Sequence, residues 1–166
     1  MKRVLLAIDA ISTWVGKAIS FIMFLVVFIV CYEVAMRYIF HRPTIWASEA
    51  MVFGCGFLYV LGAAWTMMDD RHVKIDFIWE KFSPRGRAVL DSFNFLFFAF
   101  YMGMLLWVGA KYAYESTLLR ETFGTPWNPP VYPVKISFVV GVCLLIFQGF
   151  ARWVRDLYFV FTGEKL

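Results

Sequence analysis

This sequence contains few charged residues, and four long stretches contain none. Asp, Glu, Lys and Arg make up only 17% of its 166 residues, against about 25% in soluble domains. The charge-free stretches are residues 18–32, 50–68, 92–110 and 136–151. Since a helix rises about 1.5 Å per residue, each stretch covers most or all of the roughly 30 Å hydrocarbon core of a bilayer. Such a chain leaves little polar sequence for a soluble catalytic domain.

Cysteine and recognised catalytic motifs are also scarce. The three cysteines, Cys31, Cys55 and Cys143, fall in different apolar stretches without a Cys-x-x-Cys spacing. This pattern disfavours a disulfide framework or a zinc site and indicates small buried side chains. The sequence has no P-loop, nucleophile elbow, His-Glu-x-x-His pair or Gly-x-Gly-x-x-Gly turn. No sequence motif therefore points to catalysis or to metal binding.

Apolar residues, at 61% of the chain, supply the dominant structural signal. The charge-free stretches do not alternate with period two as barrel strands do, so they predict helices. We predict an all-α integral membrane protein with one four-helix domain, residues 1–166, and spans near 14–36, 46–68, 88–112 and 134–154. An amphipathic pattern over residues 74–82 predicts a short interfacial helix in the inner loop. The first span is expected to be a retained anchor rather than a signal peptide, because no small-x-small cleavage site follows it.

The distribution of lysine and arginine predicts the orientation of the spans. With the N-terminus inside, eleven of the 16 basic residues fall on the inner side and five on the outer side. The outer five are Arg37, Arg42, Lys111, Arg120 and Lys135. Basic residues accumulate on the cytoplasmic side, so we expect both termini in the cytoplasm. The net charge of +4 then reflects topology and contact with membrane lipids rather than nucleic-acid binding.

Charged side chains at the outer membrane level are candidates for function. Glu33, Arg37, Arg42 and Glu49 lie near one level at the outer ends of the first two spans, and Glu33 and Arg37 share a helix face. They could pair to hold helices or grip a partner helix, face headgroups separately, or contact a substrate. Thr44 is expected to cap the second span.

Other polar candidates lie in the inner loop and within the spans. Arg71-His72-Val-Lys-Ile-Asp76 is the densest polar cluster. His72 could be a ligand or a proton carrier, but a single His favours a structural role at the interface. Asn94 and Gln148 are the only amide side chains in the charge-free stretches, and we expect them to bond to neighbouring helices rather than to a substrate.

Five short motifs follow one another along nearly the whole chain. They are Arg37-Tyr-x-Phe40, Trp46-x-x-Glu49, Gly62-Ala63, Arg71-His72-Val-x-Ile-Asp76, and Pro84 before the third span. In this order and spacing, and together with four spans, they resemble the DctQ family, the small membrane subunit of tripartite ATP-independent periplasmic (TRAP) transporters. The chain is similar to members made separately from the large subunit.

The resemblance implies a division of labour among subunits. A large membrane subunit would hold sodium ions and substrate and move as an elevator, and a periplasmic solute-binding protein would deliver an organic acid. This chain would be a non-catalytic scaffold in the bacterial inner membrane, with no cofactor and no substrate or metal site of its own. The implied residues for helix pairing or the subunit interface are Arg37, Glu49, Arg71, His72 and Asp76. The outer loop at Trp127 would touch the binding protein.

Two other functions are left open by the residues. One is a haem or quinone anchor of a redox complex, but such anchors usually supply axial His ligands within their spans, and His41 and His72 fall in predicted loops. The other is a stand-alone small transporter or channel. Such a protein would usually need charged groups or broken helices at mid-membrane, and no Asp, Glu, Lys or Arg lies near the middle of a span.

Overall fold

Long apolar segments form four helices in the part of the chain that the structure describes. The computed structural model describes residues 2–68 and 84–162. Its helices are α1 (Lys2–Tyr38), α2 (Ala47–Met68), α4 (Pro84–Leu118) and α5 (Tyr132–Thr162). Each is long and apolar enough to cross a membrane. The prediction of an all-helical, multi-pass membrane protein is confirmed, whereas the interfacial helix predicted for residues 74–82 lies outside the described residues.

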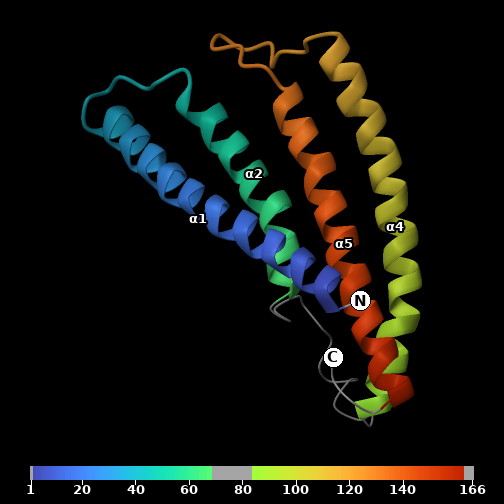
Figure 1. Ribbon diagram of the computed structural model, residues 1–166. Coiled ribbons are helices and arrows are strands. Elements are labelled where there is room, and N and C mark those ends of the chain that lie inside the picture. The colour runs from blue at the N-terminus through green and yellow to red at the C-terminus, as the bar shows by residue number, and fades with distance from the viewer. Residues whose placement is uncertain (1, 69–83, 163–166) are drawn as a thin grey trace.

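The helices extend beyond the ranges expected for the spans. α1, α4 and α5 each enclose their expected span, while α2 begins at Ala47, one residue later than expected. The 37 residues of α1 and the 35 residues of α4 correspond to roughly 50–55 Å, which is far more than a hydrocarbon core needs. α1 lies at a slant to α4 and α5 in Figure 1. Such a tilt shortens the distance that a long helix covers across the bilayer.

The four helices form an open layer in the order α1, α2, α5, α4 (Figure 1). α1 and α2 form one antiparallel hairpin, α4 and α5 form another, and contact between α2 and α5 joins the two. α1 also reaches α5. The connections 39–46 and 119–131 lie at the same end of the layer, which is the upper end in Figure 1. Residues from all four helices can therefore meet at this end, which the distribution of lysine and arginine predicts to be the outer end.

Close contact around α5 holds the layer together. In the most apolar window of α5, 39% of the residues are buried, whereas none are buried in that of α4. At Gly141, an added Cβ would lie 2.4 Å from Val60 Cγ1 and 2.7 Å from the Val60 carbonyl oxygen. The missing side chain lets the backbone of α2 lie directly against α5, as small residues do at helix contacts in membranes.

The connection between α1 and α2 differs from the prediction for Thr44. Ala50 N donates to Trp46 O at 3.0 Å, so Trp46 is the N-cap residue of α2. Thr44 N and Oγ1 both donate to Glu33 Oε2 instead, at 3.2 and 2.5 Å. The prediction that Thr44 caps α2 is wrong, because α2 begins at Ala47, directly after Trp46, and Thr44 lies two residues before that N-cap position. Thr44 thereby ties the connection to α1.

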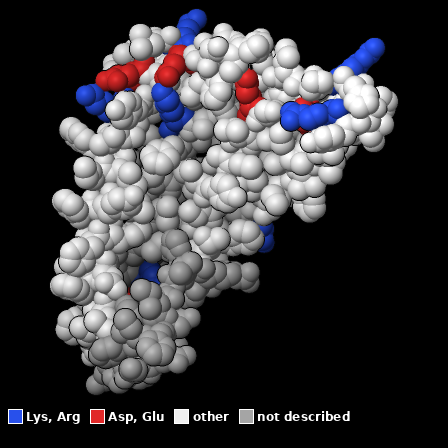
Figure 2. Space-filling model, turned by 180° about the vertical axis from the view of Figure 1, so that it is seen from behind, with Lys and Arg blue, Asp and Glu red and all other residues white. Residues whose placement is uncertain are grey.

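Charged side chains are unevenly distributed over the surface. On the face shown in Figure 2, most visible Lys, Arg, Asp and Glu atoms gather at the end where both connections lie, above a broad uncharged band. An uncharged band next to a charged rim is the pattern expected for helices that cross hydrocarbon and end at the headgroups. The charges at this end therefore lie where a membrane boundary is expected.

Gly141→Ala tests whether close contact of α2 and α5 holds the layer. The new methyl group would meet backbone as well as side-chain atoms of Val60, so the helices must separate. We expect the free energy of unfolding to fall by about 1–3 kcal/mol, measured by denaturing-detergent titration of the purified chain. Gly103→Ala on α4 is the control, because a Cβ there meets nothing within 4 Å. Equal stability of the two variants would contradict the role given to Gly141.

Candidate functional site

The outer end of α1 contains a buried and fully engaged carboxylate. Glu33 is 4% exposed. Its Oε1 accepts from Arg37 Nη2 at 2.8 Å, and its Oε2 accepts from the backbone and hydroxyl of Thr44. A buried charge is tolerated when it is paired and hydrogen-bonded in this way. The arrangement holds the end of α1 to the connection that follows it.

Glu49 does not join this network. It lies in the first turn of α2 and is 9% exposed. Among residues 2–68 and 84–162, Arg37 forms its ion pair with Glu33 and not with Glu49. Glu49 Oε2 is enclosed without a hydrogen-bond partner among the described residues. The positive end of the α2 dipole stabilises a carboxylate at this position. The Glu33 carboxylate is thus paired with Arg37, whereas the Glu49 carboxylate is enclosed at the start of α2.

Aromatic rings join the two outer connections. Tyr32 on α1 stacks on Trp46 with ring centroids 6.0 Å apart, and Trp46 meets the edge of Trp127 at 6.5 Å. Phe53 on α2 meets Phe123 of the second connection at 5.8 Å. Trp127 remains 42% exposed. The predicted contact residue of the outer loop therefore also packs within the chain and presents only part of its ring outward.

Internal hydrogen bonds shape the outer loop between α4 and α5. Gly124 N donates to Asn128 Oδ1 at 2.9 Å, and both residues have positive φ angles. Val131 N donates to Glu121 O at 2.9 Å, and the Glu121 carboxylate forms an ion pair with Lys135 on α5. The hydrogen bond from Lys135 lowers the pKa of Glu121 below its ordinary value. These contacts give the loop a defined shape beside Trp127.

A second polar network, at the other end of the layer, joins α1 to α5. Ser12 Oγ donates to Gln148 Oε1 at 3.1 Å, and Gln148 Nε2 donates to Asp9 Oδ1 at 2.9 Å. Arg155 Nη2 donates to Asp9 Oδ2 at 2.5 Å. Ser12 and Gln148 are each 1% exposed. The expected bond from Gln148 to a neighbouring helix is confirmed.

Sequence reasoning missed the other three members of this network. Asp9 and Arg155 stand in parts of α1 and α5 that the predicted spans, 14–36 and 134–154, left out. One feature of the sequence could have indicated this network: Asp9 is the only acidic residue before Glu33 in the chain. An acid in a long apolar helix usually has a partner. Its partner is 146 residues away, which no local pattern reveals.

The remaining predicted residues fall into two groups. Arg71, His72 and Asp76 lie outside the described residues. Asn94 is exposed on α4, where it lines a cavity with Asp91. Across residues 2–68 and 84–162, no three His, Cys, Asp or Glu gather as a metal ligand set would require.

The Asp9–Arg155 pair should contribute measurably to stability. We expect Asp9→Asn and Arg155→Gln each to lower the free energy of unfolding by about 1–3 kcal/mol, because each leaves a half-buried charged partner. The double variant should lose less than the sum of the two, measured by denaturing-detergent titration in a double-mutant cycle. Lys111 and Glu115 provide the comparison, since their pair is exposed and 4.0 Å long and should couple by less than about 1 kcal/mol. Equal coupling in both cycles would argue against the network.

The Glu121–Lys135 pair predicts a defined pH dependence. The pKa of Glu121 is lowered in the folded protein. The pair therefore stabilises the loop fully at any pH above the ordinary pKa of Glu. This stabilisation is lost as the pH falls through the lowered pKa of the folded state. Lys135→Met should return the Glu121 pKa toward its ordinary value. Carboxyl chemical shifts of ¹³C-labelled Glu, followed during an acid titration, measure both midpoints. An unchanged midpoint in the variant would show that Lys135 does not cause the shift.

Comparison with known proteins completes the description of the chain. No curated protein matches it. The family model for the DctQ component of tripartite ATP-independent periplasmic transporters matches residues 26–158. This match runs from within α1 to near the end of α5, so it includes Glu33, Arg37 and Glu49 and begins after Asp9 and Ser12. The chain belongs to the DctQ family, the small membrane component of TRAP transporters.

Proposed function

We propose that this chain is the non-catalytic scaffold subunit of a sodium-coupled TRAP transporter in the bacterial inner membrane. A large membrane subunit would bind the sodium ions and an organic acid, and a periplasmic solute-binding protein would deliver that acid. Both termini of the chain would face the cytoplasm, which puts the connections 39–46 and 119–131 on the periplasmic side. The chain itself would hold no cofactor and no substrate.

The observation that carries this proposal is the openness of the helix layer. The most apolar window of α4 has no buried residues, and that of α2 has 6% buried. α1 exposes large apolar side chains such as Phe21, Phe24 and Phe28. A layer of this kind offers wide apolar faces to another membrane protein, while its own contacts keep the four helices in place.

The charged networks support a structural role for the polar residues. Glu33 with Thr44, Asp9 with Arg155 and Glu121 with Lys135 each fasten one part of the chain to another. These contacts hold helices in place and give the loops a defined shape. Sodium coupling and acid binding would accordingly reside in the large subunit.

Both ends of the layer would contact the large subunit, and one of them would also contact the solute-binding protein. At the outer end, the exposed part of Trp127 stands beside a loop shaped by hydrogen bonds, and it would meet the solute-binding protein. Arg37 is half exposed and Glu49 lies at the start of α2, and both would adjoin the large subunit. Arg71, His72 and Asp76 of the inner loop would complete the contact with the large subunit on the cytoplasmic side.

Variants at Arg37 and Glu49 test the scaffold assignment. Arg37→Ala removes the charged partner of Glu33, and Glu49→Ala removes the carboxylate at the start of α2, so both should disturb the outer end of the layer. The chain is co-expressed with its large subunit and binding protein. We expect several-fold less large subunit to co-purify, with a matching loss of sodium-dependent uptake of the acid that the binding protein captures.

Glu115→Gln is the matched control, because Glu115 is exposed at the outer end of α4 and only loosely paired. It should leave both the amount of co-purified large subunit and the uptake unchanged. Full uptake together with normal co-purification in both Arg37→Ala and Glu49→Ala would overturn the roles proposed for these residues. Uptake by the purified chain alone in liposomes would overturn the scaffold function.

A further inference from the structure

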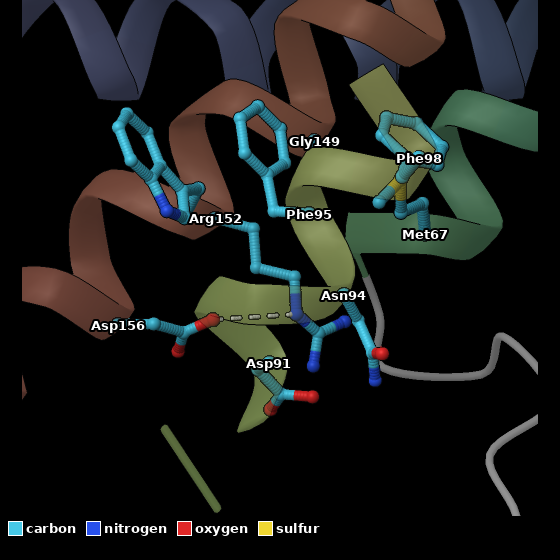
Figure 3. A pocket seen from close by; sticks show the side chains of 9 residues that line it. Met67, Asp91, Asn94, Phe95, Phe98, Gly149, Arg152 and Asp156 are labelled. Carbon is cyan, nitrogen blue, oxygen red and sulfur yellow. Dashed lines mark ion pairs between the residues drawn. The ribbon is translucent and has the colours of Figure 1, made fainter. Parts of the chain in front are cut away.

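An apolar groove of about 420 Å³ lies between α1 and α2. Its lining on α1 comes from residues between Met23 and Cys31, and its lining on α2 from residues between Cys55 and Tyr59. All of these lining residues are apolar apart from the two cysteines and the tyrosine. The cavity between α4 and α5 is different, because it contains the ion pair of Arg152 with Asp156 (Figure 3). The groove between α1 and α2 therefore suits an apolar occupant.

Close approach of the two helices forms the floor of the groove. An added Cβ at Gly54 would lie 2.4 Å from Val26 Cγ2, and Val26 is buried. Met23 and Val30 on α1 and Tyr59 on α2 are exposed beside this contact. The helices are thus packed together at the floor, and the walls leave an open side that an apolar chain can enter.

The extent of the groove matches one leaflet of a bilayer. Met23 lies near the middle of the charge-free stretch 18–32. From Met23 to Arg37, α1 advances about 21 Å along its slanted axis, whereas the hydrocarbon of one leaflet is about 15 Å deep. The groove therefore runs from near mid-membrane toward the surface beside the connection 39–46. A partner helix that crosses the whole bilayer would need a longer groove, while an acyl chain of one leaflet fits this extent.

Positive charge is exposed at the surface end of the groove. Arg37 follows Val30 by seven residues, so both lie on one face of α1. The Arg37 side chain is half exposed, and among the residues that the structure describes its guanidinium is engaged only through Nη2, by Glu33. Arg42 is also exposed. The two carboxylates of this region, Glu33 and Glu49, are buried. The surface next to the groove is therefore cationic.

The other charges at this end do not reverse that balance. Every residue from 33 to 49 and from 111 to 135 is described. In the second range, Glu121 pairs with Lys135, and Glu115 lies 4.0 Å from Lys111. Arg120 is exposed and adds another positive charge. The exposed charge at this end of the layer thus favours an anionic ligand.

We propose that the groove between α1 and α2 holds one acyl chain of an anionic phospholipid, such as phosphatidylglycerol, whose phosphate binds Arg37. The planar guanidinium matches phosphate oxygens, and basic side chains beside membrane helices attract anionic headgroups. Because lipid tails are as apolar as the lining, the headgroup sets the selectivity and the groove sets the position. The site lies wholly within this chain, so its occupancy does not depend on the proposed transport function.

Competitive lipid binding tests the headgroup. The purified full chain in mild detergent is mixed with equimolar phosphatidylglycerol and phosphatidylcholine, and the retained lipid is measured by native mass spectrometry. The two lipids carry the same fatty acids, so they differ only in headgroup. We expect phosphatidylglycerol to be retained about ten-fold over phosphatidylcholine, because it carries a net negative charge. Equal retention of the two lipids would overturn the assignment of an anionic headgroup.

Val30→Trp tests the groove by filling it. We expect the retention of phosphatidylglycerol to fall several-fold, because the indole occupies the space of the acyl chain. Val108→Trp is the matched control, since both valines are 39% exposed and Val108 lies on α4, away from the groove. It should leave retention unchanged. Equal retention by wild type and Val30→Trp would overturn the site.

Arg37→Gln tests the phosphate contact. The ten-fold preference for phosphatidylglycerol should fall to near equality, because the guanidinium is lost while the groove remains. Lys111→Gln removes the same charge at the same end of the layer, from α4, and should keep the preference. An unchanged preference in Arg37→Gln would overturn the role of Arg37.

The cysteines provide a measurement that needs no variant. Cys31 and Cys55 line the groove, whereas Cys143 lies on α5. Phosphatidylglycerol should slow the reaction of Cys31 and Cys55 with N-ethylmaleimide several-fold relative to phosphatidylcholine, and the rate at Cys143 should stay unchanged. Equal rates in the two lipids, or equal slowing at all three thiols, would contradict a lipid bound in the groove.

A helix of the large subunit is the competing occupant. The chain co-purified with its large subunit should retain as much phosphatidylglycerol as the chain alone. Loss of the lipid from that complex would overturn the phospholipid assignment in favour of a partner helix, and it would leave the scaffold function standing.

Discussion

Close contact at α5 is the constraint on which the remaining structure depends. Lipid tails are as apolar as Leu side chains, so helices in a membrane gain little by hiding apolar surface from the solvent. They associate where their backbones approach closely, and Gly141 allows this against Val60 of α2. With α5 fixed between α2 and α4, Gln148 comes opposite Ser12 of α1, and Arg155 comes opposite Asp9. Steric fit between α2 and α5 and polar contacts between α1 and α5 thus act on the same central helix.

The two ends of the layer use different means to hold α1. At the end that carries the connections 39–46 and 119–131, Glu33 accepts hydrogen bonds from Arg37 and Thr44, which are close to it in the chain. At the opposite end, Asp9 accepts hydrogen bonds from Gln148 and Arg155, which belong to another helix. Each carboxylate has both oxygens engaged, so neither charge is left buried without a partner. The first arrangement shapes a connection, whereas the second fixes a long tilted helix to the centre of the layer.

The sequence predicts what depends on local pattern. Charge-free length predicts the four helices because each helix satisfies its own backbone, whatever lies next to it. The Glu33–Arg37 pair was foreseeable from the i, i+4 spacing alone. The partner of Asp9 was not, because it depends on the slant of α1 across α5. Thr44 was misassigned for a related reason: a cap was expected from its place before α2, while the deciding acceptor was Glu33 on the preceding helix. The contact of Trp46 with Trp127 likewise joins two connections that are far apart in the chain.

An open layer is stable in lipid for a reason that does not hold in water. In water, the exposed rings of α1 and α4 would drive the helices to close into a compact bundle. In lipid, the same rings are solvated, so the chain keeps wide apolar faces without a free-energy penalty. The contacts around α5 and at Asp9, which build the chain, therefore lie apart from the broad apolar faces of α1 and α4. This separation would suit the proposed scaffold role.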